Sequence, residues 1–280
     1  MIKHVLIVGL GFMGGSLAKS IKKYTGIKIT ALDINEEYLN KALEEGIISK
    51  GIKQVDCNID ADVVFICTPV GKIIDCIYEI IPYLKKGCII TDIGSTKKLI
   101  MEKIEKILPD DMYFIGGHPM AGTEKSGFTA SVSNLFKDTS YFIMPIKNVP
   151  NDIVKLFIDE IIIKIGAKPV IIDYNLHDRF TAIISHVPHI VSAALSNFAC
   201  SEGPDAIQYA AGGFKDTTRI AMSQTEMWKD IVISNKETIK ELLLKYSEIL
   251  AEFISYLDKE DIKSIEKFFD DARMYRSSIE

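Results

Sequence analysis

The sequence predicts an α/β fold for its first part and an all-helical domain for the remainder of its 280 residues. Three observations support this fold class. Short β-branched runs alternate with longer helical patterns, and they recur at the spacing of strands joined by crossover helices, which favours a parallel sheet. After residue 172 the chain shows long helical patterns and no convincing strand. We therefore expect one domain at residues 1–172 and a second at 173–280.

Each expected element follows from local periodicity. The expected strands cover residues 3–8, 28–32, 63–67, 88–92, 112–115, 141–145 and 168–172. Helices fill most gaps between them and begin near Phe12, Asn35, Val70, Ser95 and Asn151.

In the second domain, residues 236–257 show one apolar helical stripe. Its members recur every three or four positions and are Ile239, Leu243, Tyr246, Leu250, Phe253 and Leu257. Such a stripe needs a partner surface, either within its own domain or on a second copy of the chain. We favour the second alternative, a homodimer.

Composition and charge exclude several classes of protein. The net charge is −5, and the lysines are scattered beside glutamates, which argues against a nucleic-acid partner. The five cysteines are odd in number and form no CxxC pair, as expected for reduced thiols in a cytoplasmic protein. The N-terminus lacks the pattern of a signal peptide, and the apolar stretches stop short of the ~18 residues of a spanning helix. We expect a cytoplasmic location and no membrane partner.

The first expected strand runs directly into a GxGxxG motif and then into a helix. In this context Gly9 permits a tight turn, Gly11 lets a diphosphate approach the backbone, and Gly14 lets the helix pack closely on the strand. Phe12 and Met13 lie inside the motif and belong to the same site. The motif therefore predicts a Rossmann-like dinucleotide-binding domain.

Asp33 provides a second, independent indication of a dinucleotide. It ends the second strand about 20 residues after the glycines, where a carboxylate accepts hydrogen bonds from ribose hydroxyls. Residues 34–37 contain no Arg or Lys to neutralise a 2′-phosphate, which favours NAD over NADP. The alternative role for Asp33 is an N-cap of the following helix. Thr68 and Pro69, which follow the third strand, are assigned to the cofactor site as well.

Two further stretches follow strands at the edge where open parallel sheets bind ligands. They are residues 92–97, with Ser95, and residues 116–124, with His118. An imidazole accepts protons near neutral pH, and the Ser95 hydroxyl could fix its tautomer. The alternative for His118 is a turn residue that binds a loop carbonyl, which is also the role we assign to His4 and His177.

Residues 185–189 and 213–221 carry the remaining candidate groups. His186 and His189 could bind a metal from one helical face, but no third ligand has fitting spacing, so we expect hydrogen-bonding roles and no metal. Arg219 could form a surface ion pair with Asp216 or a bidentate clamp for a substrate carboxylate. These two alternatives remain open on residue chemistry alone.

Together these stretches resemble the prephenate dehydrogenase family, also called the TyrA family, over nearly the whole chain. The specific motifs are Gly-Gly-His-Pro-Met-Ala-Gly-Thr-Glu at 116–124, Ser-His-x-Pro-His at 185–189 and Gly-Phe-x-Asp-Thr-Thr-Arg-Ile-Ala at 213–221. The resemblance implies a helical C-terminal dimerisation domain and a substrate held between the domains. It assigns His118 as the base and Ser95 as the group that orients it. It also implies substrate-binding or gating roles for His186, Arg219, Thr123, Glu124, Lys215 and Asp216.

The implied reaction is the NAD-dependent oxidative decarboxylation of prephenate in tyrosine biosynthesis. Arogenate, or both compounds, is the alternative substrate. Because little chain follows Arg276, we expect tyrosine to inhibit at the active site and not at an added regulatory domain. A β-hydroxyacid dehydrogenase is a distant alternative, since its GxxGxGxxxK helix is absent after Asp173. An NAD-binding regulator without catalytic activity is the alternative from another class.

Overall fold

The structure of this chain is a computed structural model, and it describes residues 1–122 and 125–279. The chain forms two compact units, Met1–Asn235 and Lys236–Glu280. The elements that carry the described residues of the candidate site lie in the first unit.

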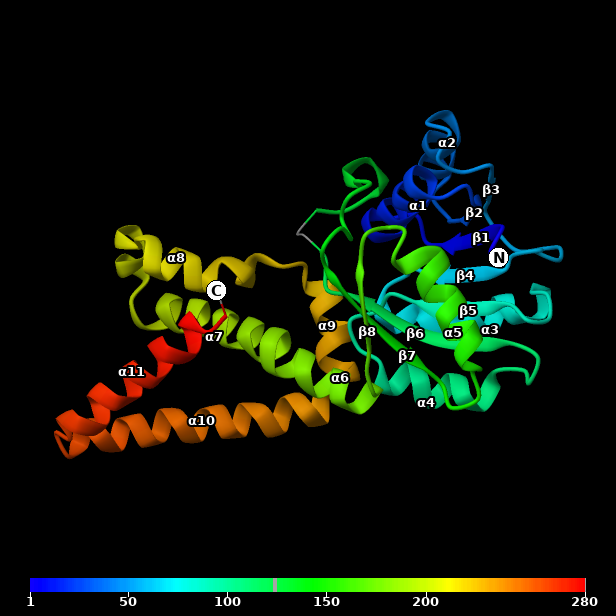
Figure 1. The fold of residues 1–280 in the computed structure, drawn as a ribbon. Coiled ribbons are helices and arrows are strands. Elements are labelled where there is room, and N and C mark those ends of the chain that lie inside the picture. The colour runs from blue at the N-terminus through cyan, green and yellow to red at the C-terminus, as the bar shows by residue number, and fades with distance from the viewer. Residues whose placement is uncertain (123–124, 280) are drawn as a thin grey trace. The chain divides into compact units, whose positions relative to one another are not determined.

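The first unit is built on an eight-stranded sheet with the strand order β3-β2-β1-β4-β5-β6-β7-β8 (Figure 1). Every neighbouring pair is parallel except β6 and β7, which are antiparallel. The strands are β1 His4–Val8, β2 Lys28–Leu32, β3 Lys50–Ile52, β4 Val63–Ile66, β5 Ile89–Asp92, β6 Tyr113–Pro119, β7 Ser140–Pro145 and β8 Lys168–Ile171.

All seven expected strands are present, with two differences from the prediction. The sheet is mixed, because β7 returns antiparallel to β6 with His118 opposite Phe142. The connection between them, residues 120–139, holds a short 3₁₀ turn, Phe128–Ala130, but its described residues form no α-helix of the kind that usually makes a parallel crossover. The second difference is β3, a three-residue edge strand with little β-branched character that the sequence does not predict.

Helices cover both faces of the sheet. Alternate residues of β1 point to opposite faces, so that Val5 and Ile7 belong to one core and Leu6 and Val8 to the other. The first core also contains residues of α1 Phe12–Tyr24, α2 Glu36–Glu44 and α5 Asn151–Phe157. The second contains residues of α3 Ile73–Ile80 and α4 Lys98–Ile107. This layering leaves the carboxyl ends of the parallel strands at one edge.

A continuous helical stretch follows the sheet. It consists of α6 Tyr174–Thr181, a π-helical segment Ala182–His186 and α7 Val187–Glu202, and Asp173 caps its start by accepting hydrogen bonds from two backbone N–H groups. By length and composition alone, the stretch Tyr174–Glu202 could span a membrane, with a mean hydropathy of 1.2 in its most apolar window. The unit ends with α8 Gly212–Thr218, a 3₁₀ turn Arg219–Met222 and α9 Thr225–Ser234.

The second unit is a pair of helices, α10 Lys236–Asp258 and α11 Ile262–Ser277. Phe253 of α10 packs against Phe268 of α11, with ring centroids 4.9 Å apart. The predicted apolar stripe on α10 is only partly covered, since Leu250 and Leu257 are about half exposed, at 48% and 54%.

Candidate active site

The loop between β1 and α1 has the geometry that the glycine motif predicts. Gly9 adopts a φ of +91°, which favours glycine. A Cβ on Gly14 would lie 1.9 Å from the carbonyl oxygen of Gly9, so only glycine lets α1 start this close to the strand. A Cβ on Gly11 would meet nothing within 4 Å. The backbone at Gly11 is therefore open to a ligand such as a diphosphate.

This loop lies where the strand order of the sheet reverses, between β1 and β4. The backbone N–H of Cys67 donates to the Val8 carbonyl at 2.7 Å, which places the ends of these two strands side by side. Thr68 and Pro69 come next in the chain and lie at the same edge. In open α/β sheets this position is the usual ligand crevice.

Asp33 lies beside the glycine loop, and it is not the helix cap that we considered. Its carboxylate accepts hydrogen bonds from the backbone N–H groups of Leu10 and Asn35, at 2.5 and 2.7 Å. The N-cap of α2 is Asn35, whose side-chain oxygen accepts from the Tyr38 N–H at 3.2 Å. Asp33 is partly exposed, so its carboxylate keeps acceptor sites that are open to solvent.

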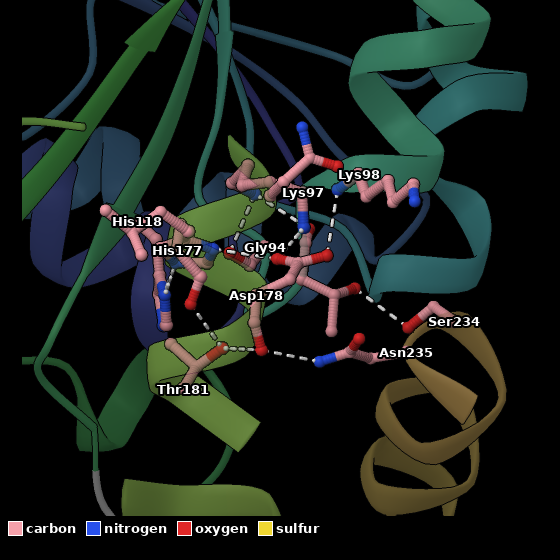
Figure 2. A network of polar contacts seen from close by, with 12 residues as sticks. Gly94, Lys97, Lys98, His118, His177, Asp178, Thr181, Ser234 and Asn235 are labelled. Atoms are coloured by element: carbon pink, nitrogen blue, oxygen red, sulfur yellow. Dashed lines mark hydrogen bonds and ion pairs between the residues drawn. The ribbon is translucent and has the colours of Figure 1, made fainter. Parts of the chain in front are cut away.

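His118 lies near the end of β6 and begins a chain of three hydrogen-bonded side chains (Figure 2). Its Nδ1 is 2.8 Å from Nε2 of His177, and Nδ1 of His177 is 2.8 Å from Oδ1 of Asp178. The Asp178 carboxylate also accepts the backbone N–H groups of Lys97 and Lys98, at 2.8 and 2.9 Å. Asp178 therefore connects the start of α4 to the candidate base.

A buried ion pair holds the loop that carries Ser95. Lys97 and Asp92 are both fully buried, with Nζ 2.5 Å from Oδ2. Lys97 also donates to the carbonyls of Gly94 and Thr96, at 2.8 and 3.1 Å, and the Gly94 N–H donates to Asp92. Buried charges persist when their hydrogen-bonding capacity is filled in this way. The Ser95 hydroxyl itself makes no hydrogen bond to any other described residue.

The histidines of this region are held in the neutral state. Burial lowers the pKa of His118 well below its usual range, and electrostatic interactions with His177, Lys97 and His186 lower it further. Burial also lowers the pKa of His177, although the Asp178 hydrogen bond opposes that shift. The pKa of His186 falls to about 4, mainly through burial. At neutral pH these rings therefore act as hydrogen-bond donors and acceptors and carry no charge.

His186 and His189 both lie against the Trp228 ring, His186 edge to face with centroids 6.1 Å apart, but they have different hydrogen-bond partners. Asn235 donates from Nδ2 to the Asp178 carbonyl at 2.8 Å, and the same nitrogen lies 3.4 Å from Nδ1 of His186. His189 stacks on the Trp228 ring with centroids 3.7 Å apart. Within residues 1–122 and 125–279, no group of three His, Cys, Asp or Glu gathers as a metal site.

Arg219, Lys215 and Asp216 are exposed and form no ion pair with one another or with other described residues. The surface ion pair between Asp216 and Arg219 is therefore not observed. Burial lowers the pKa of His189, and the charge of Arg219 adds a smaller lowering, which places the guanidinium within electrostatic reach of that ring. Thr123 and Glu124, which complete the expected substrate and gate residues, lie outside the described residues.

Two residues of the site were not predicted from the sequence. His177 was assigned a structural role, and Asp178 was not considered, yet these two side chains continue the hydrogen-bond chain from His118. The available signal was their adjacency, one turn after the helix cap Asp173. Because they lie 59 and 60 positions after His118 in the chain, only the tertiary fold brings them together.

A glycine loop at the reversal point of the sheet and a neutral histidine at the same edge define a dinucleotide-dependent dehydrogenase. Two family models match the chain, the prephenate dehydrogenase nucleotide-binding domain over residues 17–171 and the prephenate dehydrogenase dimerization domain over residues 173–271. This chain belongs to the prephenate dehydrogenase family.

Individual relatives agree with this membership. Prephenate dehydrogenase of Lactococcus lactis is 34% identical, over 100% of this chain and 78% of its own length. The crystal structure of prephenate dehydrogenase from A. aeolicus, in complex with hydroxyphenyl propionate and NAD+, superposes with a TM-score of 0.93 at 33% identity and covers 100% of this chain and 99% of the other. Arogenate dehydrogenase of Synechocystis is similar, with a TM-score of 0.88, 26% identity and coverage of 99% and 100%.

Proposed function

We propose that the chain is an NAD-dependent prephenate dehydrogenase that oxidises prephenate at its C4 hydroxyl with loss of CO2, giving 4-hydroxyphenylpyruvate. The observation that carries this proposal is the position of His118. Its ring lies at the carboxyl edge of the sheet, neutral and hydrogen-bonded through Nδ1 to His177, which leaves Nε2 to accept a proton. We also propose the domain boundary at residues 172 and 173.

The cofactor is held by the loop Gly9–Gly14, by Asp33 and by Thr68 and Pro69. The open backbone at Gly11 receives the diphosphate, and the Asp33 carboxylate receives the ribose hydroxyls. When bound, NAD supplies the acceptor for the hydride that leaves C4. With Phe12 and Met13 in the same loop, these residues fix where the cofactor lies relative to His118.

His118 takes the hydroxyl proton as the C4 oxygen becomes a carbonyl, and such assistance contributes typically ~10²–10⁴-fold to the rate. Loss of CO2 then follows from the aromaticity of the product. In this proposal Ser95, on the loop held by the Lys97–Asp92 pair, orients His118 near the nicotinamide. No metal and no covalent nucleophile is required.

Arg219 binds one of the two substrate carboxylates. Its guanidinium makes no ion pair with the described residues, so its donors are available for a bidentate contact. His186 contributes a hydrogen bond and not a charge, because its pKa of about 4 keeps the ring neutral. Thr123, Glu124, Lys215 and Asp216 complete the binding and gating residues in this proposal.

Arogenate is the second candidate substrate, since a Synechocystis relative with a TM-score of 0.88 is an arogenate dehydrogenase. Assays of the purified chain with each compound, and with NAD or NADP, should show NADH formation that is fastest with prephenate and NAD. Faster turnover of arogenate would make arogenate, and not prephenate, the preferred substrate. If no combination of substrate and cofactor gives NADH or NADPH, the result would support the alternative that the chain is an NAD-binding regulator without catalytic activity.

The variant His118→Asn tests the base directly. It should lose about 10²-fold or more in kcat while KM for prephenate stays nearly constant, because the base acts only in the transition state. Full activity of this variant would remove His118 from the mechanism.

For partners and location, we propose a cytoplasmic homodimer without a membrane or nucleic-acid partner. The dimerization-domain match supports the dimer. His177 and Asp178, near the start of the apolar stretch Tyr174–Glu202, are buried in the hydrogen-bonded site. Tyrosine, which resembles substrate and product, should inhibit by competing at the active site.

A further inference from the structure

We infer that His177 and Asp178 are positioning residues that hold His118 in the one neutral tautomer able to act as a base. The inference rests on the proposed role of His118 and adds two residues to it. It depends on which nitrogen of each ring carries a hydrogen, and the donors and acceptors around the chain decide this.

Asp178 determines which ring nitrogen of His177 carries the hydrogen. Its carboxylate accepts the backbone N–H groups of Lys97 and Lys98, at 2.8 and 2.9 Å, so it is surrounded by donors at the start of α4. The same Oδ1 lies 2.8 Å from Nδ1 of His177. An accepting oxygen requires a hydrogen on that nitrogen, and Nδ1 of His177 is therefore the donor.

The neutral His177 ring in turn determines which nitrogen of His118 carries the hydrogen. A neutral imidazole carries a single ring hydrogen, so Nε2 of His177 presents a lone pair to Nδ1 of His118 at 2.8 Å. This lone pair requires the hydrogen of His118 to sit on Nδ1. Nε2 of His118 is then the free acceptor, which is the state a general base needs.

A further consequence concerns the charge that appears when His118 takes a proton. The imidazolium keeps its Nδ1–H bond to His177, and charge-assisted hydrogen bonds are roughly twice as strong as neutral ones. The Asp178 carboxylate favours the cation through the His177 ring. The Lys97 ammonium opposes it, but Asp92 pairs with that ammonium in the buried site.

A simple packing role for His177 makes a different prediction. The ring is fully buried and meets the Phe142 ring edge to face, with centroids 5.3 Å apart. If packing were its only role, phenylalanine would replace it with little effect on catalysis. The hydrogen-bonding role requires an acceptor at the position of Nε2, which glutamine can supply and phenylalanine cannot.

The test compares His177→Phe and His177→Gln in the full chain. His177→Phe should lower kcat by about 10- to 100-fold, part of the range for acid–base assistance, with the KM values for prephenate and NAD changed less than about twofold. His177→Gln should recover most of the lost kcat. A His177→Phe variant with the kcat of the original chain would overturn the inference.

The matched control is His4→Phe. His4 is also hydrogen-bonded through both ring nitrogens, to the Asp60 carbonyl and the Thr30 hydroxyl, but it lies at the opposite end of β1 from the glycine loop. Its replacement should lower thermal stability and leave kcat unchanged. An equal loss of kcat in both variants would mean that lost stability explains the effect, and the inference would be rejected.

A spectroscopic measurement on the unsubstituted chain keeps the test independent of folding defects and of the substrate. The ¹⁵N NMR shifts of His118, assigned by comparison with His118→Asn, should report Nδ1–H and a bare Nε2 at neutral pH. A hydrogen on Nε2 would overturn the inference even if His118→Asn is inactive. Conversely, a fully active His118→Asn with the expected tautomer would contradict the proposed function alone.

Discussion

At the scale of single residues, the chemistry of this protein depends on keeping an imidazole neutral. Burial of His118, its neighbours His177 and His186 and the Lys97 ammonium together lower the pKa of this ring and disfavour its cation. A base needs a free lone pair at the working pH. The same environment therefore sets the acid limit of activity.

The pH dependence of kcat/KM should show this directly. Because the pKa of free His118 is lowered, its neutral and active form persists as the pH falls through 6.5, the ordinary value for histidine. Activity should be lost only at lower pH, where the ring finally takes a proton. An acid limb in the kcat/KM profile of prephenate with a midpoint at or above 6.5 would contradict this.

The sequence located His118, Asp33 and the glycines because each lies in a short motif or directly after a strand. It could not locate His177 as a partner of His118, because a buried hydrogen bond between residues far apart in the chain leaves no local pattern. It also could not decide between the two roles of Arg219. That choice depends on which carboxylates lie within reach, and Asp216 forms no ion pair with it.

At the scale of elements, the ends of strands and the starts of helices build the site. Strand boundaries were predicted to within a few residues because buried parallel strands read as β-branched runs. The direction of β7 was not predicted, since direction depends on how the connection crosses the sheet. Helix α4 begins at Lys98 and not near Ser95, because the loop before it is held by Lys97 and capped by Asp178.

The start of α1 offers a prediction with a built-in control. Gly14→Ala places a methyl group 1.9 Å from the Gly9 carbonyl oxygen, and such overpacking should lower the free energy of unfolding by about 1–3 kcal/mol. Gly11→Ala meets nothing within 4 Å and should change stability by less than about 0.5 kcal/mol.

For NAD affinity we expect the reverse order, with a larger effect of Gly11→Ala than its effect on stability suggests. Gly11→Ala should weaken the binding of NAD, because its methyl group fills the space proposed for the diphosphate. Chemical denaturation and NAD titration of each variant provide the measurements. A Gly11→Ala variant that binds NAD as tightly as the original chain would place the diphosphate elsewhere.

At the scale of the whole molecule, apolar surface remains on the second unit. Leu250, Ile254 and Leu257 of α10 are each about half exposed. Contiguous apolar surface of this kind marks an interaction site. We therefore expect a second copy of the chain to pack against the predicted stripe.

The expected assembly is a dimer with a mass twice the 31.3 kDa of the chain. Ile254→Glu should shift the mass in light scattering toward that of a single chain, because it charges an exposed apolar side chain. Lys240→Glu, an exposed polar position on the same helix, should leave the dimer intact. If Ile254→Glu has no effect on the mass, α10 is not the contact surface.

The π-helical segment Ala182–His186 sets which way the residues after it face. His177 and His186 are nine positions apart, so a regular α-helix, at about 100° per residue, would direct them to opposite sides. The one extra residue of a π turn reduces that separation to about 80°. Both rings can then be buried on the side where Asn235 meets the Asp178 carbonyl and His186. Removing a single residue from 182–186 would rotate His186, His189 and the rest of α7 by about a quarter turn, so the spacing of this segment is as much a requirement of the site as the identity of its side chains.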